Sequence, residues 1–188
     1  MVLFAGPNGS GKTTLYYEKF ANARLKGIEY NNPDEYAKKH GGDVVGGRLA
    51  IKRRTELLKT QTSFVTESTL AGKSPLRLLD QAKKAGFQTT LIYIGTATPN
   101  LNITRVKQRA RSGGHDVKSD DIIRRYHGSI ANLASAISKA DISHVYSSNA
   151  VTRRLFSARD GSLRARSAMV LSKWVPESIR SALLRPLD

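Results

Sequence analysis

Short apolar runs alternate along this chain with longer stretches in which apolar residues recur every three or four positions. The runs lie at residues 2–5, 28–30, 62–66, 89–94 and 143–146. Each run has the length and apolar character of a buried strand, and the stretches between them have the period of an amphipathic helix. Strands that alternate with helices form parallel sheets with right-handed crossovers. We therefore predict an α/β fold with a five-stranded, mostly parallel sheet flanked by helices.

Residues that typically start and stop helices bound the stretches between these runs. Helices are predicted at residues 14–23, 48–59, 74 to about 86 and 98 to about 112, with a short helix opening at 34–35. The longest helix is predicted to begin at Ser119. Its apolar stripe comprises Ile123, Tyr126, Ile130, Leu133 and Ile137. Glycine pairs at 41–42 and 46–47 predict loops.

The pattern changes after the fifth run. Residues 154–158 and 163–167, joined by a turn at 159–161, predict a β-hairpin, and residues 175–184 predict a short terminal helix. We find no internal repeat and no low-complexity linker. The sequence therefore predicts a single domain over residues 1–188, with a lid at about 111–120 and the hairpin and helix at about 153–188.

Composition narrows the class of protein. The chain has 188 residues, of which 39% are hydrophobic, so it can bury a core. It has no cysteine, which excludes disulfides and thiolate metal sites. No apolar run reaches the roughly 18 residues that span a bilayer. The first run lacks a basic n-region and leads directly into a glycine-rich loop, so we do not expect it to be a signal peptide. We expect a cytoplasmic protein without a membrane partner.

The formal net charge of +16 indicates an affinity for anions. Nucleic acid, a small substrate with several phosphates and an acidic protein all fit this charge. A solvated basic surface also accounts for it, so the charge by itself does not choose a partner.

The segment Gly6–Thr13 carries the clearest chemistry. It matches the pattern of a phosphate-binding loop, and it lies between a predicted strand and a predicted helix. Its backbone N–H groups and the helix N-terminus favour anions. Lys12 can reach the terminal phosphates, and the Thr13 hydroxyl can bind Mg²⁺. The predicted cofactors are ATP and Mg²⁺, held by Gly6, Asn8, Gly9, Ser10, Gly11, Lys12, Thr13 and Thr14.

Two carboxylates follow predicted strands on the same edge of the sheet. Asp34 comes after the second strand, where a kinase needs a base that orients the acceptor hydroxyl. It is also a common residue at a helix N-terminus. Glu67 ends the third strand and is a candidate for the metal or its water shell. The adjacent Ser68 and Thr69 offer hydroxyls for an acceptor, although ordinary loop polarity also explains them.

Arginines flank a glycine-rich loop at residues 112–117. Arg105 and Arg109 share one helix face before the loop, and Arg124 and Arg125 follow it. Helix, flexible loop and helix with arginines at both bases is typical of a lid that brings cations over a γ-phosphate. His115 in the loop is a candidate for positioning the loop or a substrate. A basic solvated face is the alternative for any single arginine.

These motifs together resemble the zeta-toxin family of P-loop kinases. The resemblance covers about residues 1–160 and is carried by the segments Gly6–Thr13, Asn32–Asp34, Phe64–Leu70, Arg105–Arg109, Gly113–Val117 and Ile123–Tyr126. It implies a fold like that of nucleoside monophosphate kinases. It also implies ATP-dependent phosphorylation of a sugar hydroxyl on UDP-N-acetylglucosamine or a related UDP-sugar. An antitoxin protein becomes a candidate partner.

The resemblance also implies roles for individual residues. Lys12 and Asp34 would be catalytic, together with the phosphate clamp Arg111 and Arg124 or their neighbours Arg109 and Arg125. The acceptor would be bound by Asp34, Glu67, Ser68, Thr69, His115 and Arg125, the nucleotide also by Arg109, and the metal by Thr13 and Glu67.

The chain departs from the family pattern at three places. It begins on its first strand, without the helices that antitoxin-paired members place before it. Lys118 stands where proline is expected, and residues 147–149 lack an expected aspartate. Two other functions compete with a small-molecule kinase: a polynucleotide kinase or nucleic-acid-binding ATPase, and a nucleotide-operated switch.

Overall fold

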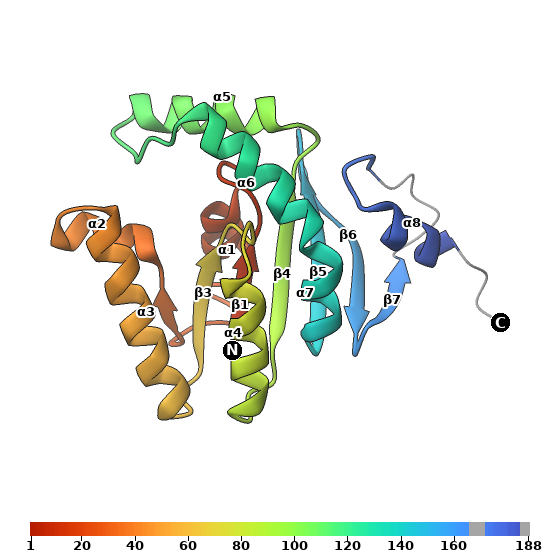
Figure 1. Ribbon diagram of the computed structural model, residues 1–188, viewed down its shortest axis with the longest axis horizontal. Helices are drawn as coiled ribbons and strands as arrows, with labels where there is room; N and C mark the ends of the chain where they lie inside the picture. Colours follow the sequence, from red (N-terminus) through yellow and green to blue (C-terminus); the bar gives the residue numbers. More distant parts are fainter. Residues whose placement is uncertain (166–171, 185–188) are drawn as a thin grey trace.

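A computed structural model describes residues 1–165 and 172–184 of the chain. Its centre is a seven-stranded sheet with the order β2-β3-β1-β4-β5-β6-β7 (Figure 1). The strands are β1 Val2–Ala5, β2 Glu29–Asn31, β3 Phe64–Ser68, β4 Thr90–Gly95, β5 Ile142–Ser148, β6 Thr152–Arg159 and β7 Ser162–Ala165. The first five strands in chain order pair in parallel, as the alternation of strands and helices predicts.

Helices cover both faces of this sheet. They are α1 Lys12–Lys19, α2 Pro33–His40, α3 Asp43–Lys59, α4 Ser74–Lys84, α5 Pro99–Arg111, α6 Ser119–Ala131, α7 Leu133–Lys139 and α8 Glu177–Leu184. Figure 1 shows α3, α4 and α7 in front of the sheet and α1 behind it. The helices α5 and α6 lie across the top, above the carboxyl ends of the central strands.

Alternate residues of β1 enter two separate apolar cores. Leu3 packs with residues of α3, α4 and α7, whereas Phe4 packs with Leu15 and Tyr16 of α1. Leu3 and Phe4 are both fully buried. Because successive side chains of a strand point to opposite faces, one short apolar strand anchors both layers of helices.

The sheet has two strands more than the five that we predicted. The predicted hairpin forms as far as Ala165, and residues 166–167 of the prediction lie outside the described residues. Its strands β6 and β7 extend the sheet beyond β5 in antiparallel pairing. Leu155 and Phe156 of β6 are buried in the same core as α7. The apolar content of the hairpin is therefore explained by its docking on the main sheet.

The prediction of a loop at Gly46-Gly47 is wrong. Both glycines lie inside α3, which at 17 residues is also longer than the helix that begins at Ser119. A Cβ atom at Gly46 would lie 2.4 Å from the backbone nitrogen of Ala37 in α2. Gly46 therefore permits close contact between α2 and α3. In the sequence alone, a glycine with this role looks the same as a glycine in a loop.

The predicted long helix is divided in two. α6 ends at Ala131 and α7 begins at Leu133, with Asn132 between them. The Asn132 side chain donates hydrogen bonds to the carbonyl oxygens of Leu70, at 2.9 Å, and Gly72, at 3.3 Å. The buried stripe also includes Ile122, whereas Ile123 is 37% exposed.

The helix after Gly11 is shorter than predicted, since it ends at Lys19.

Within the described ranges, no helix combines the length and apolar character that a membrane span requires.

Two neighbouring glycines of α3 provide a stability test. Gly46→Ala should lower the free energy of unfolding by about 1–3 kcal/mol, because its methyl group would clash with the backbone of α2. Gly47→Ala meets no atom within 4 Å and should raise stability by about 0.5–1 kcal/mol, the usual gain from removing a helical glycine. Urea unfolding followed by circular dichroism measures both. Equal effects of the two substitutions would contradict the close contact.

Candidate active site

The candidate site is a cavity of about 710 Å³ at the carboxyl ends of the central strands. Parallel pairing aligns these ends, since Ala5 of β1 lies opposite Ser68 of β3 and Tyr93 of β4. The cavity is lined by loops and helix ends that follow β1, β2, β3 and β5 and by residues of α5 and α6. Ligands of parallel α/β proteins bind at this position.

The loop Gly6–Thr13 forms one wall of the cavity. Within this segment Gly11 adopts a left-handed conformation with φ of 90° and immediately precedes α1, which begins at Lys12. The Lys12 ammonium donates to the carbonyl oxygens of Gly6, at 2.9 Å, and Pro7, at 3.1 Å. Burial lowers the pKa of Lys12, and the nearby carboxylates of Glu67 and Asp34 oppose this decrease. The loop thus places a cation and a helix N-terminus where a phosphate can bind.

A buried asparagine of α5 supports this loop from outside. Asn102 donates from Nδ2 to the carbonyl oxygen of Asn8 at 2.5 Å, and its Oδ1 accepts from the Thr96 hydroxyl. A Cβ atom at Gly9 would lie 2.8 Å from the Asn102 carbonyl oxygen. Gly9 is therefore required for close packing of the loop against α5, and Asn102 fixes the loop to the end of β4.

Glu67 joins the loop to the neighbouring strands. Its Oε1 accepts a hydrogen bond from the Thr13 hydroxyl at 3.0 Å and another from the Tyr30 hydroxyl. Burial, followed by the nearby Glu67 carboxylate, raises the pKa of Tyr30 above its usual value. The Tyr30 hydroxyl therefore remains protonated at neutral pH. Together with the Thr13 hydroxyl it holds the Glu67 carboxylate in one orientation.

This arrangement fits a magnesium–nucleotide. Mg²⁺ prefers hard oxygen ligands and is usually bound by one or two protein groups together with phosphate and water. Thr13 and Glu67 supply a hydroxyl and a carboxylate beside the phosphate-binding loop. No group of three or more histidine, cysteine or acidic residues forms a metal site in the part of the chain that the structure describes. The donor set therefore suits a metal that arrives with the nucleotide.

Asp34 faces the cavity from the first turn of α2. The sequence also allows Asp34 to cap the helix, but the N-cap of α2 is Asn32. The Asn32 side chain accepts from the backbone N–H of Asp34 at 3.0 Å. The Asp34 carboxylate is exposed and is available to an acceptor. Ser68 and Thr69 line the same cavity from the end of β3, with the Ser68 hydroxyl accepting from the backbone N–H of Leu70.

The structure separates the arginines of the predicted lid. Arg109 and Arg125 line the cavity. Arg109 also donates to the carbonyl oxygen of His115 at 2.7 Å, and Arg125 donates to the side-chain oxygen of Asn8 at 3.4 Å. The first contact holds the loop between α5 and α6 against α5, and the second joins α6 to the phosphate-binding loop.

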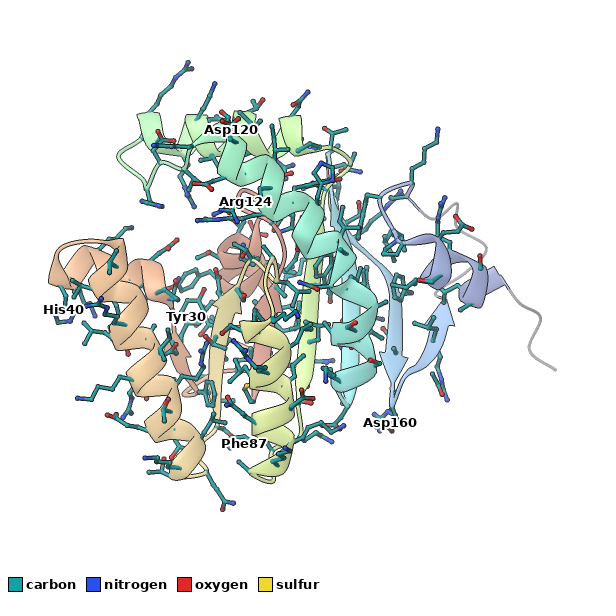
Figure 2. All side chains as sticks on the ribbon, in the orientation of Figure 1. Tyr30, His40, Phe87, Asp120, Arg124 and Asp160 are labelled. Atoms are coloured by element: carbon teal, nitrogen blue, oxygen red, sulfur yellow. The ribbon has the colours of Figure 1, made fainter. Side chains whose placement is uncertain are left out.

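Arg111 and Arg124 are not among the residues that line the cavity. Arg124 forms an ion pair with Asp121, and its side chain is 70% exposed. Figure 2 marks Arg124 on α6. Of the two arginine pairs considered for the phosphate clamp, Arg109 and Arg125 line the cavity, whereas Arg111 and Arg124 do not.

Most of the predicted site residues meet at this cavity. The lining includes Asn8, Gly9, Gly11, Lys12, Thr13, Thr14, Asp34, Glu67, Ser68, Thr69, Arg109, His115 and Arg125. Gly6 and Ser10 belong to the loop but are buried and are not among the lining residues. The lining residues that the site prediction omitted include Arg105, Ser148 and Thr152.

Arg105 connects α5 to the turn between β5 and β6. It donates to the carbonyl oxygen of Ser148 at 2.9 Å and to that of Asn149 at 2.5 Å. The Asn149 side chain in turn accepts from the backbone N–H of Ala97 at 2.8 Å. In the sequence, the four-residue spacing of Arg105 and Arg109 indicates that both lie on one face of a helix. No such pattern in the sequence marks Ser148 or Thr152 as lining residues.

Comparison with known proteins gives one relative in sequence. A protein of Haemophilus influenzae, described as uncharacterized, is 32% identical over 127 residues, which cover 66% of this chain and 91% of the relative. No family model matches the sequence.

Solved structures share the fold at lower identity. A complex of AvrRxo1-ORF1 and AvrRxo1-ORF2 aligns with a TM-score of 0.67 and 17% identity over 89% of this chain. This chain spans only 61% of the matched AvrRxo1 chain. A second structure of that complex, with ATP, aligns with a TM-score of 0.64. The PezAT toxin–antitoxin system of Streptococcus pneumoniae aligns with a TM-score of 0.59 and 16% identity, over all of this chain and 79% of the matched one.

These likenesses establish the fold of the chain. The α/β architecture with a mostly parallel sheet flanked by helices agrees with the prediction from the sequence.

The support of the loop by Asn102 can be tested through stability. Asn102→Ala removes both hydrogen bonds of a buried side chain and should lower the free energy of unfolding by about 1–3 kcal/mol. Asn100→Ala, on the exposed face of the same helix, should change it by less than about 0.5 kcal/mol. Thermal unfolding of the two variants gives the comparison. Equal stability of both variants would show that Asn102 is not an anchor.

Proposed function

We propose that this chain, which belongs to the same family as the Haemophilus influenzae protein, is an ATP-dependent kinase with an alcohol group as acceptor. One observation carries the proposal: a single cavity brings together the phosphate-binding loop, the Thr13–Glu67 pair, the Asp34 carboxylate and two lid arginines. The AvrRxo1 structure with ATP, which shares the fold, supports ATP as the donor.

The donor would lie along the loop and the N-terminus of α1. Lys12 would leave its carbonyl partners and contact the β- and γ-phosphates. Thr13 would bind Mg²⁺ with Glu67 beside it, and the metal would neutralise charge on the phosphates. Because phosphoryl transfer needs little covalent chemistry from the protein, most of the rate enhancement comes from positioning and charge.

Asp34 would orient the acceptor hydroxyl and take its proton as the oxygen attacks the γ-phosphorus. Its position at the start of α2, on the wall of the cavity that Lys12 also lines, suits this role. Arg109 and Arg125 would stabilise the negative charge on the transferring group. Closure of the α5–α6 loop over the cavity would bring them nearer and exclude water, which otherwise competes as an acceptor.

For the acceptor we propose a UDP-sugar such as UDP-N-acetylglucosamine. The sequence resemblance to zeta toxins motivates this class. The lining of the cavity supports a hydrophilic ligand, since it includes the polar residues Glu67, Ser68 and Thr69. His115 of the α5–α6 loop and Arg125 of α6 also line it. An antitoxin partner is proposed by the same resemblance and by the fold shared with the PezAT system.

A second function also fits the charge of the molecule. A net charge of +16 suits an acceptor on a nucleic-acid end, so a polynucleotide kinase is the alternative.

The assay that tests the proposal is phosphorus NMR of the protein with Mg-ATP and a panel of UDP-sugars. Asp34→Asn should bind ATP normally and lower transfer by about 100-fold or more, as expected for loss of a general base. The neighbouring Glu35→Gln should leave transfer unchanged, because Glu35 accepts from Tyr17 on the exposed surface. Lys12→Ala should lose transfer together with phosphate binding.

A new phosphomonoester that requires both the sugar and Asp34 identifies the acceptor. Hydrolysis of ATP to ADP at one rate, whatever sugar is added, would rule out the panel. Nucleic-acid ends would then be tested in the same assay. Unchanged transfer by Asp34→Asn would exclude Asp34 as the base.

Adjacent arginines distinguish the two versions of the phosphate clamp. Arg125→Ala should lower the rate of transfer by about 100–1,000-fold, the usual cost of losing a donor to transition-state charge. Arg124→Ala should have a much smaller effect, because its guanidinium pairs with Asp121 away from the cavity. Single-turnover kinetics separates this effect from nucleotide binding. The reverse order of the two effects would restore Arg124 as the clamp.

A further inference from the structure

We infer that Tyr30 is a positioning residue that holds the Glu67 carboxylate for the magnesium–nucleotide and links it to the helix that carries Asp34. The inference rests on the proposed function, because it assigns a further residue to the same site. Tyr30 is not itself among the residues that line the cavity. It acts through Glu67, which is.

A chain of hydrogen bonds leads from the phosphate-binding loop to α2. The Thr13 and Tyr30 hydroxyls both donate to the same oxygen, Oε1, of Glu67. The Tyr30 oxygen accepts from Nδ2 of Asn32 at 3.3 Å. Oδ1 of Asn32 then accepts from the backbone N–H of Asp34. The phosphate-binding loop is thereby connected to the start of α2, the helix that carries Asp34.

The direction of each hydrogen bond determines what remains for a ligand. A hydroxyl has one hydrogen and two lone pairs. Thr13 uses its hydrogen on Glu67 and keeps its lone pairs for a cation. Two donors on Oε1 restrain rotation of the Glu67 carboxylate, and Oε2 has no hydrogen bond within the described residues. A restrained carboxylate with a free oxygen is suited to bind the metal or its water.

The ring of Tyr30 gives its hydroxyl a fixed position. It stacks on Tyr16 with centroids 4.0 Å apart and an interplanar angle of 18°. Tyr16 is 5% exposed and also meets Phe4 edge-on at 5.5 Å. In Figure 2 Tyr30 lies beside β3, whereas His40, at the end of α2, lies at the periphery. β2 is held in register there, with Tyr30 opposite Val65.

Isothermal titration of ADP, with Mg²⁺ and with EDTA, tests the inference without relying on turnover. Partners that orient a metal ligand usually contribute 10–100-fold to metal affinity. Tyr30→Phe should therefore reduce the enhancement of ADP affinity by Mg²⁺ about 10–100-fold, while affinity in EDTA stays the same. The ring stays, so the stack on Tyr16 is retained. Tyr17→Phe is the matched control. Among the described residues the Tyr17 hydroxyl bonds only to Glu35, so its loss should leave both affinities unchanged.

A double-mutant cycle shows whether Tyr30 acts through Glu67. Glu67→Gln alone should also reduce the enhancement by Mg²⁺, and adding Tyr30→Phe to it should cause little further loss. Additive losses would overturn the inference. So would an unchanged enhancement in Tyr30→Phe, or an equal loss with Mg²⁺ and with EDTA, which would indicate a structural role.

The failure of the inference is distinguishable from failure of the proposed function. If the wild-type protein binds no ADP under either condition, the proposed kinase and the inference are both overturned. If the wild type binds Mg-ADP and Tyr30→Phe binds it equally well, the kinase stands and the inference alone is lost.

Discussion

The position of β1 between β3 and β4 is the constraint on which the site depends. β1 has only four residues, and it pairs in parallel on both sides. Its hydrogen bonds therefore determine how far each neighbouring strand extends toward the loops. Because Ala5, Ser68 and Tyr93 lie in one row, the groups that follow β1 and β3 reach the same level of the molecule without long connections. A shift of register by one residue would exchange the two cores and separate Lys12 from Glu67.

The parts of the site that lie on loops are fixed by side chains from elsewhere. Asn102 supports the phosphate-binding loop, Arg105 supports the turn after β5, and Asn132 holds the segment after β3. Each of them donates to backbone carbonyl oxygens. A loop cannot satisfy all its own polar groups when it is partly buried, so such donors compensate the cost of its burial. A rigid wall of this kind leaves the α5–α6 loop, with its glycines, as the part of the site best suited to move.

Local sequence was sufficient to predict the parts of the site whose residues lie close together in the chain or directly after a strand. The phosphate-binding loop is determined by glycines within a few positions, and Asp34 and Glu67 could be placed because they follow strands that must end on the same edge. Tyr30, Asn102 and Arg105 could not be assigned in this way. Their contacts join residues 37, 94 and 43 positions apart, so they arise only when the sheet has formed. Gly46 shows the opposite error, because a glycine in a helix and a glycine in a loop are indistinguishable until the partner helix is known.

The packing at the end of β4 has a practical consequence. Trp174 is the only tryptophan in the sequence. It is buried against Tyr93 and against Gly95, where a Cβ atom would lie 2.4 Å from its ring. Gly95 immediately precedes Thr96, whose hydroxyl bonds to Asn102 beneath the phosphate-binding loop. Tryptophan fluorescence of the unmodified protein thus comes from one indole. This indole is buried, and Thr96 and Asn102 connect the strand end on which it packs to that loop. The fluorescence of Trp174 can therefore report on the packing at the end of β4 without an added label.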